Sequence, residues 1–299
     1  FTVTDLRPGD IISYSAGSTE TGPYGFRKAK ARVNLLTETE SRFPGTTAAI
    51  GDRTILFINA YPATVGPFLP GISVDTYLSP RILSRALVLG NVTNHPVILV
   101  AQPLFLADAL LKHIKEGRSL PDTLLFWVGG YVMHQSLEKM LMARLAPLVK
   151  HATIIQYFGT AEVDAGCMIA RDRNENGQLI YYPRTDVDPE LEGEDLFLTL
   201  RNADGSKAIE RFRTGDRAQK HGDGFMIWNP VRLHPAVDME LEQFTDEDWE
   251  RRTGYVRREG EAIFKQLREG ETPRDSTELE HFEFARRFGF SWLNKPWWR

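Results

Sequence analysis

The sequence predicts an α/β protein, in which a parallel sheet with helices precedes a smaller antiparallel β section. Short apolar runs alternate with amphipathic stretches through the first 170 residues, as in chains that build a layered α/β fold. Beyond them, strand-length runs are separated by Asn-Gly and Asp-Gly pairs, which are typical of hairpin turns. We therefore divide the chain into an α/β core (1–170), a β-rich section (171–230) and a reduced helical C-terminal segment (231–299).

The elements follow from local patterns. Short apolar, β-branched or aromatic runs predict strands at 11–14, 54–58, 96–100, 124–128 and 153–157. Leu106, Leu110 and Ile114 recur at helical spacing, which predicts a helix over 103–117, and a similar pattern predicts another over 137–148. Later strands are expected at 178–182, 196–200 and 225–228, with turns at Asn176-Gly177, Asp204-Gly205 and Asp223-Gly224. The segment from Thr245 is charged, rich in tryptophan, and expected to dock on something through its aromatic end.

Composition limits the function classes. With 42% hydrophobic and 25% charged residues among 299, the chain has the balance of a globular protein, not of a disordered one. A net charge of −4 argues against a nucleic-acid partner. No apolar run reaches about 18 residues, so no membrane span is predicted. The single Cys167 excludes an internal disulfide, favours a cytoplasmic location, and is interpreted as a buried packing residue.

Residues 15–25 (SAGSTETGPYG) form a loop of glycines and hydroxyl side chains directly after a predicted strand. Such a loop can surround phosphate oxygens with backbone N–H groups and hydroxyls. It is not a Walker A loop, because Pro23-Tyr24 stand where Lys and Ser/Thr are required. Considered alone, the loop is equally well explained as a surface turn.

Two further motifs could contact a nucleotide. Tyr157–Glu162 (YFGTAE) ends a predicted strand, where ligands of α/β folds gather, and a glutamate there can hold Mg²⁺ against a phosphate. Phe212–Asp216 (FRTGD) places an aspartate at an expected strand end, where it can accept hydrogen bonds from ribose hydroxyls. Each motif alone is better explained as an ordinary turn.

Taken together and in order, these motifs resemble those of the ANL superfamily of acyl-adenylate-forming enzymes, which includes acyl-CoA synthetases, luciferases and peptide-synthetase adenylation domains. The glycine- and serine-rich loop, the Gly129-Gly130 turn, Phe158–Glu162 and Phe212–Asp216 are similar to four family motifs. The resemblance covers about residues 10–242. It implies an ANL-like large-domain core that activates a carboxylic acid with ATP and Mg²⁺.

The resemblance also implies roles for individual residues. The residues expected to wrap the β- and γ-phosphates of ATP are Ser15, Gly17, Ser18, Thr19, Thr21 and Gly22. Those expected around the adenine and the acyl group are Gly129, Gly130, Tyr131, His134, Phe158 and Gly159. Thr160 or Ala161 is expected near the α-phosphate, Thr160 and Glu162 are the expected catalytic residues, and Glu162 is the expected Mg²⁺ ligand. Asp216 is expected to hold the ribose, with Arg232 as a further contact.

The sequence departs from the family in three places. Tyr24 stands where many members have lysine, although members that resemble phenylacetate–CoA ligases also lack that lysine. Ala161 stands where the family motif has a threonine. Compared with the family, the chain is also expected to be truncated at both ends, without the usual small C-terminal domain. Two other readings therefore stay open: a remnant that binds nucleotide or acyl ligand without turnover, and a protein that only binds a partner.

The resemblance leaves the acid and the acyl acceptor undefined. CoA, a carrier thiol or an amine could each take the acyl group. Because the missing subdomains would leave apolar surface and sheet edges uncovered, we expect a homodimer or a stable partner subunit. Neither a nucleic acid nor a membrane is expected as a partner.

Overall fold

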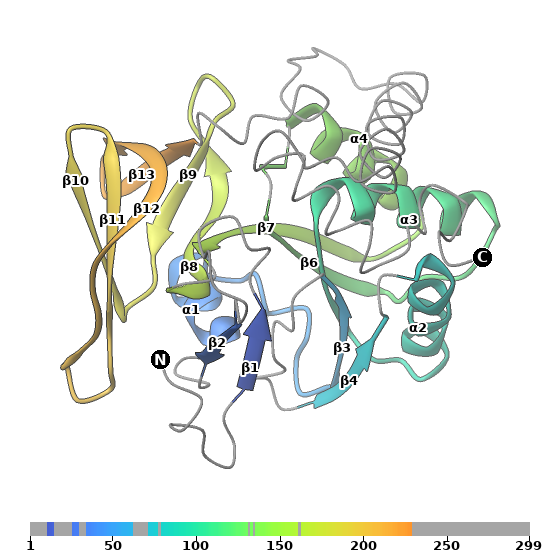
Figure 1. Ribbon diagram of the computed structural model, residues 1–299. Coiled ribbons are helices and arrows are strands. Elements are labelled where there is room, and N and C mark those ends of the chain that lie inside the picture. The colour runs from blue at the N-terminus through green and yellow to red at the C-terminus, as the bar shows by residue number, and fades with distance from the viewer. Residues whose placement is uncertain are drawn as a thin grey trace, which may run out of the picture.

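The computed structural model describes residues 11–14, 26–29, 34–61, 71–76, 79–130, 132–133, 135–160 and 163–228. Five strands form its parallel part: β3 (Ile55–Ala60), β4 (Gly71–Asp75), β5 (Val97–Ala101), β6 (Thr123–Val128) and β7 (His151–Thr160). They pair in the order β4-β3-β5-β6-β7, each parallel to the next. A separate hairpin is formed by β1 (Ile11–Tyr14) and β2 (Phe26–Ala29) (Figure 1).

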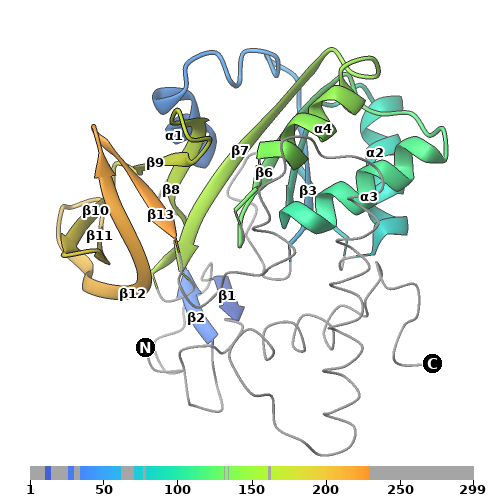
Figure 2. The same ribbon diagram turned by 90° about the horizontal axis from the view of Figure 1, so that it is seen from above.

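Helices cover both faces of the parallel part (Figure 2). One face carries α2 (Pro80–Val92), α3 (Pro103–Lys115) and α4 (Gln135–Leu145), and α1 (Leu35–Arg42) lies on the other. Alternation along β3 explains how one strand serves two cores, since successive side chains point to opposite faces. Leu56 and Ile58 pack in the core under α2–α4, whereas Ile55 and Phe57 pack in the core beside α1.

Six antiparallel strands extend the same sheet: β8 (Asp164–Arg173), β9 (Leu179–Pro183), β10 (Val187–Glu192), β11 (Asp195–Arg201), β12 (Lys207–His221) and β13 (Gly224–Trp228). The transition occurs at β7, which is parallel to β6 on one side and antiparallel to β8 on the other. In the part of the chain described, the sheet has 11 strands in the order β10-β11-β12-β13-β9-β8-β7-β6-β5-β3-β4. A third apolar core packs between the antiparallel strands.

The predicted fold class is confirmed: helices pack on a parallel sheet, and an antiparallel section follows. The long apolar strands and both predicted helices appear within a few residues of their expected positions. The sequence patterns did not predict α1, α2, β2, β4, β8 or β10, and they gave no bounds for β12. The expected tail, 231–299, lies outside the described residues. None of the described helices is long and apolar enough to cross a membrane.

One turn differs from its prediction. Asp223-Gly224 is not the centre of the last hairpin, because His221 and Gly224 pair with each other and Gly222-Asp223 form the turn between them. Gly222 has the positive φ of 57°, which favours glycine. Gly224 is required for a different reason, since a Cβ there would lie 2.5 Å from Cγ2 of Ile180.

Candidate functional site

The carboxyl ends of β3, β5, β6 and β7 meet at one edge of the sheet, because these strands are parallel. Figure 2 shows the β1–β2 hairpin on the side toward which the β7 arrow points. Tyr14 pairs with Phe26, so residues 15–25 connect the two strands of this hairpin. The six loop residues predicted to bind phosphate themselves lie outside the described residues: Ser15, Gly17, Ser18, Thr19, Thr21 and Gly22.

Gly129 and Gly130 follow β6 at this edge and lie close to neighbouring strands. Gly130 has a φ of +83°, and a Cβ there would be 2.6 Å from the hydroxyl of Tyr61 and 3.2 Å from Nε2 of Gln102. A Cβ on Gly129 would be 3.1 Å from the carbonyl oxygen of Tyr157. Gly130 is therefore needed for its left-handed backbone conformation, and both glycines are needed because neighbouring atoms leave no room for a side chain.

The backbone just beyond the Gly-Gly turn is held at Met133. The N–H of Met133 donates to Oε1 of Gln156 (3.0 Å), and its carbonyl accepts from NH2 of Arg173 (2.7 Å). The same Arg173 nitrogen contacts Oε2 of Glu138 at 2.5 Å. Gln156 is buried. Strands β7 and β8 thus fix the segment between the Gly-Gly turn and α4, while the predicted pocket residues Tyr131 and His134 lie outside the described residues.

At the end of β7, Thr160 presents a buried hydroxyl. Among the described residues its Oγ1 has no hydrogen-bond partner. A buried polar atom usually finds a partner in protein, water or ligand, so this hydroxyl fits a role as donor to a phosphate oxygen. Phe158 and Gly159 precede it in the same strand. Ala161 and Glu162 lie outside the described residues.

The indole Nε1 of Trp127 is a second buried atom that lacks a hydrogen-bond partner in the described part of the chain. Trp127 stands two residues before Gly129, and its ring makes an edge contact with that of Tyr157, with centroids 5.3 Å apart. Two polar groups available for a ligand therefore occur near the carboxyl ends of adjacent strands.

Asp216 lies inside β12, which corrects its predicted position at a strand end. Next to it, Gly215 has a φ of +80°, and the pairing of β12 with β11 shifts register there. This irregularity is a β-bulge within the strand, and β12 continues beyond it. The N–H of Asp216 donates to Oγ1 of Thr214 (3.0 Å), and this hydroxyl donates to the carbonyl of Leu196 (3.0 Å). Only 7% of Asp216 is exposed. Thr214 thus ties the backbone of a buried aspartate to β11 at the bulge.

Tyr181 on β9 packs against Phe158. The rings of Phe158 and Tyr181 make an edge contact at 6.1 Å between centroids. Burial raises the pKa of Tyr181, while the charge of Arg173 lowers it and that of Asp216 raises it by smaller amounts. Phe158, predicted to border the adenine, thus packs against an aromatic ring from another strand.

Sequence patterns did not single out Tyr181, Gln156 or Arg173. The aromatic pair Tyr181-Tyr182 in a predicted strand is a signal that could have drawn attention to Tyr181. No local sequence pattern identifies Gln156 or Arg173, because both bind the backbone of Met133, which is distant from them in the sequence.

In the described residues, no group of three or more His, Cys, Asp or Glu side chains could hold a metal ion. The predicted Mg²⁺ site is of another kind, in which one or two carboxylates bind the ion together with substrate phosphates. Glu162 would be that carboxylate. Arg232, predicted to contact the ribose, also lies outside the described residues.

Comparison with known proteins gives only distant likenesses. No protein-family model matches the sequence, and no curated protein is similar to it. Similar solved structures include a long-chain-fatty-acid-CoA ligase from Archaeoglobus fulgidus (13% identity, TM-score 0.47, over 72% of this chain and 51% of that one). An amide bond synthetase from Marinactinospora thermotolerans (14%, 0.48, 74% and 49%) and a luciferase-like enzyme from the mealworm Zophobas morio (14%, 0.47, 75% and 58%) are also similar.

By their names, these three proteins are enzymes of the kinds whose motifs the sequence resembles. The chain spans about half to three fifths of the length of these structures. Their TM-scores are below 0.5, so the likeness does not assign an activity, and the function proposed below depends on the residues of this chain.

Proposed function

We propose that this protein activates a carboxylic acid with ATP as an acyl adenylate, and then passes the acyl group to CoA, a carrier thiol or an amine. The observation that carries the proposal is the buried hydroxyl of Thr160, which has no hydrogen-bond partner among the described residues and stands in the third of four ordered motifs. The aromatic contact of Phe158 with Tyr181 and the buried carboxyl residue Asp216 support it, because an aromatic face and a carboxylate suit an adenosine.

The reaction joins two anions and therefore depends on position and charge. A carboxylate oxygen of the acid attacks the α-phosphorus, the bond to the bridging oxygen of the β-phosphate breaks, and pyrophosphate leaves. In this site, Thr160 would donate a hydrogen bond to an α-phosphate oxygen, where negative charge must be stabilised. Asp216 would accept hydrogen bonds from the ribose hydroxyls. Mg²⁺ held by Glu162 would neutralise phosphate charge.

The test is exchange of labelled pyrophosphate into ATP in the presence of a panel of carboxylic acids. The wild-type chain is expected to catalyse exchange with at least one acid. Asp216→Asn and Thr160→Val are each expected to lower kcat/KM about 10- to 100-fold, because each removes one hydrogen bond to a charged or developing-charge group. Asp223→Asn, in the exposed turn between β12 and β13, is the matched control and is expected to retain activity.

Two results would contradict the proposal. Nucleotide binding without exchange for any acid would favour a remnant that does not turn over. Absence of nucleotide binding would favour a protein that acts only by docking on a partner.

A further inference from the structure

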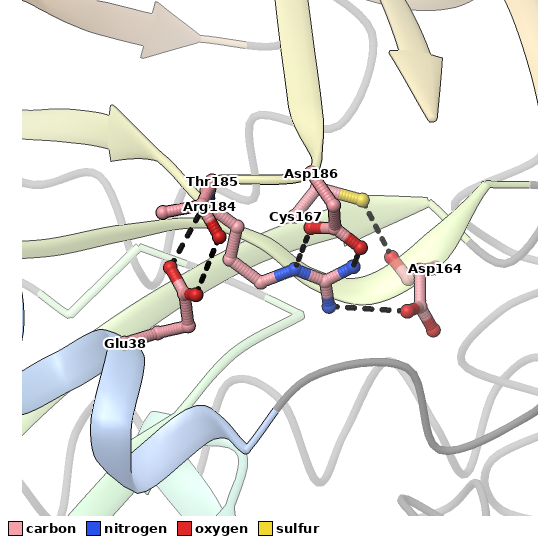
Figure 3. A network of polar contacts seen from close by, with 6 residues as sticks. All are labelled: Glu38, Asp164, Cys167, Arg184, Thr185 and Asp186. Carbon is pink, nitrogen blue, oxygen red and sulfur yellow. Dashed lines mark hydrogen bonds and ion pairs between the residues drawn. The ribbon is translucent and has the colours of Figure 1, made fainter. Parts of the chain in front are cut away.

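A buried ion cluster lies at the start of β8 and just after β9 (Figure 3). It consists of Arg184, Asp164 and Asp186, and is called here the Arg184 cluster. Nε and NH2 of Arg184 donate to the two carboxylate oxygens of Asp186 at 2.9 and 3.0 Å, and NH1 donates to Oδ2 of Asp164 at 3.1 Å. The side chain of Arg184 is 2% exposed. Burial alone would lower its pKa, but the neighbouring carboxylates outweigh burial and raise it.

Asp164 is fixed at two points. Its carboxylate is held by Arg184, and its backbone carbonyl accepts a hydrogen bond from Sγ of Cys167 at 3.0 Å. Cys167 is itself fully buried, and its carbonyl accepts the N–H of Arg184 at 3.0 Å. The backbone of Asp164 therefore has little freedom to move relative to β9.

Asp164 closes the turn that joins β7 to β8. Thr160 pairs with Asp164 across the two strands, and the N–H of Val163 donates to the carbonyl of Thr160 at 3.1 Å. Only residues 161–163 lie between them. A displacement of Asp164 would thus be transmitted directly to Thr160, the proposed α-phosphate donor. Glu162, the proposed Mg²⁺ ligand, stands in the same stretch of sequence.

The same region is connected to α1. The N–H and hydroxyl of Thr185 donate to the two carboxylate oxygens of Glu38 at 3.1 and 2.6 Å (Figure 3). This contact fixes the residue next to Arg184 against a helix on the opposite side of the cluster. The segment that carries Arg184 is thereby held against α1 through Thr185, while NH1 of Arg184 reaches Asp164 at the turn.

We propose that Arg184 is a positioning residue: it holds the Thr160–Asp164 turn in the geometry that acid activation requires. The inference builds on the proposed function. An arginine is needed because its planar fork can bind both oxygens of Asp186 and still reach Asp164, which a lysine ammonium cannot reproduce. The residue touches neither substrate nor metal in this assignment and acts through the turn.

The test compares Arg184→Lys with Arg201→Lys. Arg201 contacts Asp188 at 2.5 Å on the same sheet, but its side chain is 42% exposed, so it serves as the matched control. Arg184→Lys is expected to lower kcat for pyrophosphate exchange about 10- to 100-fold, as outer-shell partners of catalytic and metal-binding groups typically do when replaced. It is also expected to raise the Mg²⁺ concentration for half-maximal exchange. Arg201→Lys should change neither quantity.

A second readout does not depend on activity. Hydrogen–deuterium exchange of peptides covering 158–167 is expected to become faster in Arg184→Lys and to stay unchanged in Arg201→Lys, in protein that remains folded by circular dichroism. If this region exchanges as in the wild type, or if kcat and the Mg²⁺ dependence are unaltered, the positioning role is wrong.

The coupling to Thr160 separates positioning from general stability. If Arg184 acts through the turn, its substitution should have a much smaller effect in a Thr160→Val background than in the wild type. Equal effects in both backgrounds would overturn the proposal. A wild-type chain without any pyrophosphate exchange would instead contradict the proposed function, and the hydrogen-exchange comparison would still decide whether Arg184 fixes the turn.

Discussion

His113 shows how a single buried side chain can make the stability of this protein depend on pH. The ring is 1% exposed, Nδ1 lies 2.7 Å from Oγ of Ser84, and Nε2 lies 2.9 Å from the carbonyl of Ser119. A carbonyl only accepts, so Nε2 carries a proton, and in the neutral ring Nδ1 accepts from the Ser84 hydroxyl. That hydroxyl in turn accepts from NH1 of Arg118 at 2.9 Å. The neutral ring thus leaves each of these polar atoms with a partner.

Burial lowers the pKa of His113 below its ordinary value of 6.5. The folded state thus binds a proton less readily than the unfolded state, so its contribution to stability is complete above 6.5 and is lost as pH falls through the folded pKa. We expect the melting temperature to decrease between pH 7 and pH values below the folded pKa. His113→Gln should be less stable at pH 7 but show a weaker decrease, whereas His221→Gln, at an exposed position, should follow the wild type. A pH dependence unchanged by His113→Gln would contradict this role.

At the scale of elements, the Gly-Gly turn after β6 depends on close packing between three strand ends. Gly130 combines a positive φ with the nearby Tyr61 hydroxyl, whereas Gly117, after α3, has a φ of +65° and open space around it. An alanine at Gly130 would meet both an unfavourable backbone conformation and a steric clash, whereas an alanine at Gly117 would meet only the unfavourable backbone conformation.

Gly130→Ala is expected to destabilise the fold by about 1–3 kcal/mol, because strained backbone and a clash add together. Gly117→Ala should lie near the lower limit of about 1 kcal/mol, which reflects the left-handed backbone alone. Urea denaturation measures both. Gly130→Ala is also expected to lower pyrophosphate exchange, since the turn would shift at the proposed acyl pocket. Equal destabilisation in the two variants would show that the Tyr61 contact is unimportant.

At the scale of the whole molecule, the sheet has an uncovered edge at β4. In the described part of the chain β4 pairs only with β3, most of its residues are exposed, and Ile72 is 44% exposed. Open parallel edges with apolar side chains tend to pair with another chain or to be covered. We therefore propose that this edge contributes to a homodimer.

Sedimentation velocity is expected to give about twice the chain mass of 34.0 kDa. Ile72→Lys should shift the equilibrium toward the monomer, because a charge on the edge strand opposes pairing. Leu148→Lys, just after α4, replaces a side chain that is 50% exposed, and α4 contacts β7, which three strands separate from β4, so it is the matched control. A wild-type monomer at micromolar concentration would contradict the dimer.

Most of the fold could be predicted because its signals are local. The continuous apolar run Leu124–Val128 is typical of a strand that is buried on both faces. The leucines of α3 recur every three to four residues, as on one face of a helix. Strand β8 was missed because a residue-by-residue pattern does not show that Asp164–Arg173, with charges at both ends, is buried at its centre. Helix α1 was missed because its polar side chains give little periodicity, and it is held by contacts such as Thr39 with Tyr157.

The sequence by itself determined the order of the elements and the four short motifs, because periodicity, turn chemistry and loop composition are written along the chain. The tertiary structure alone decided that Asp216 lies buried within a strand, that Thr160 has a buried hydroxyl, and that Arg184 binds Asp164 and Asp186. These relations join residues of different strands. Their energies depend on burial and on distances of about 3 Å, which only the pairing of the strands establishes.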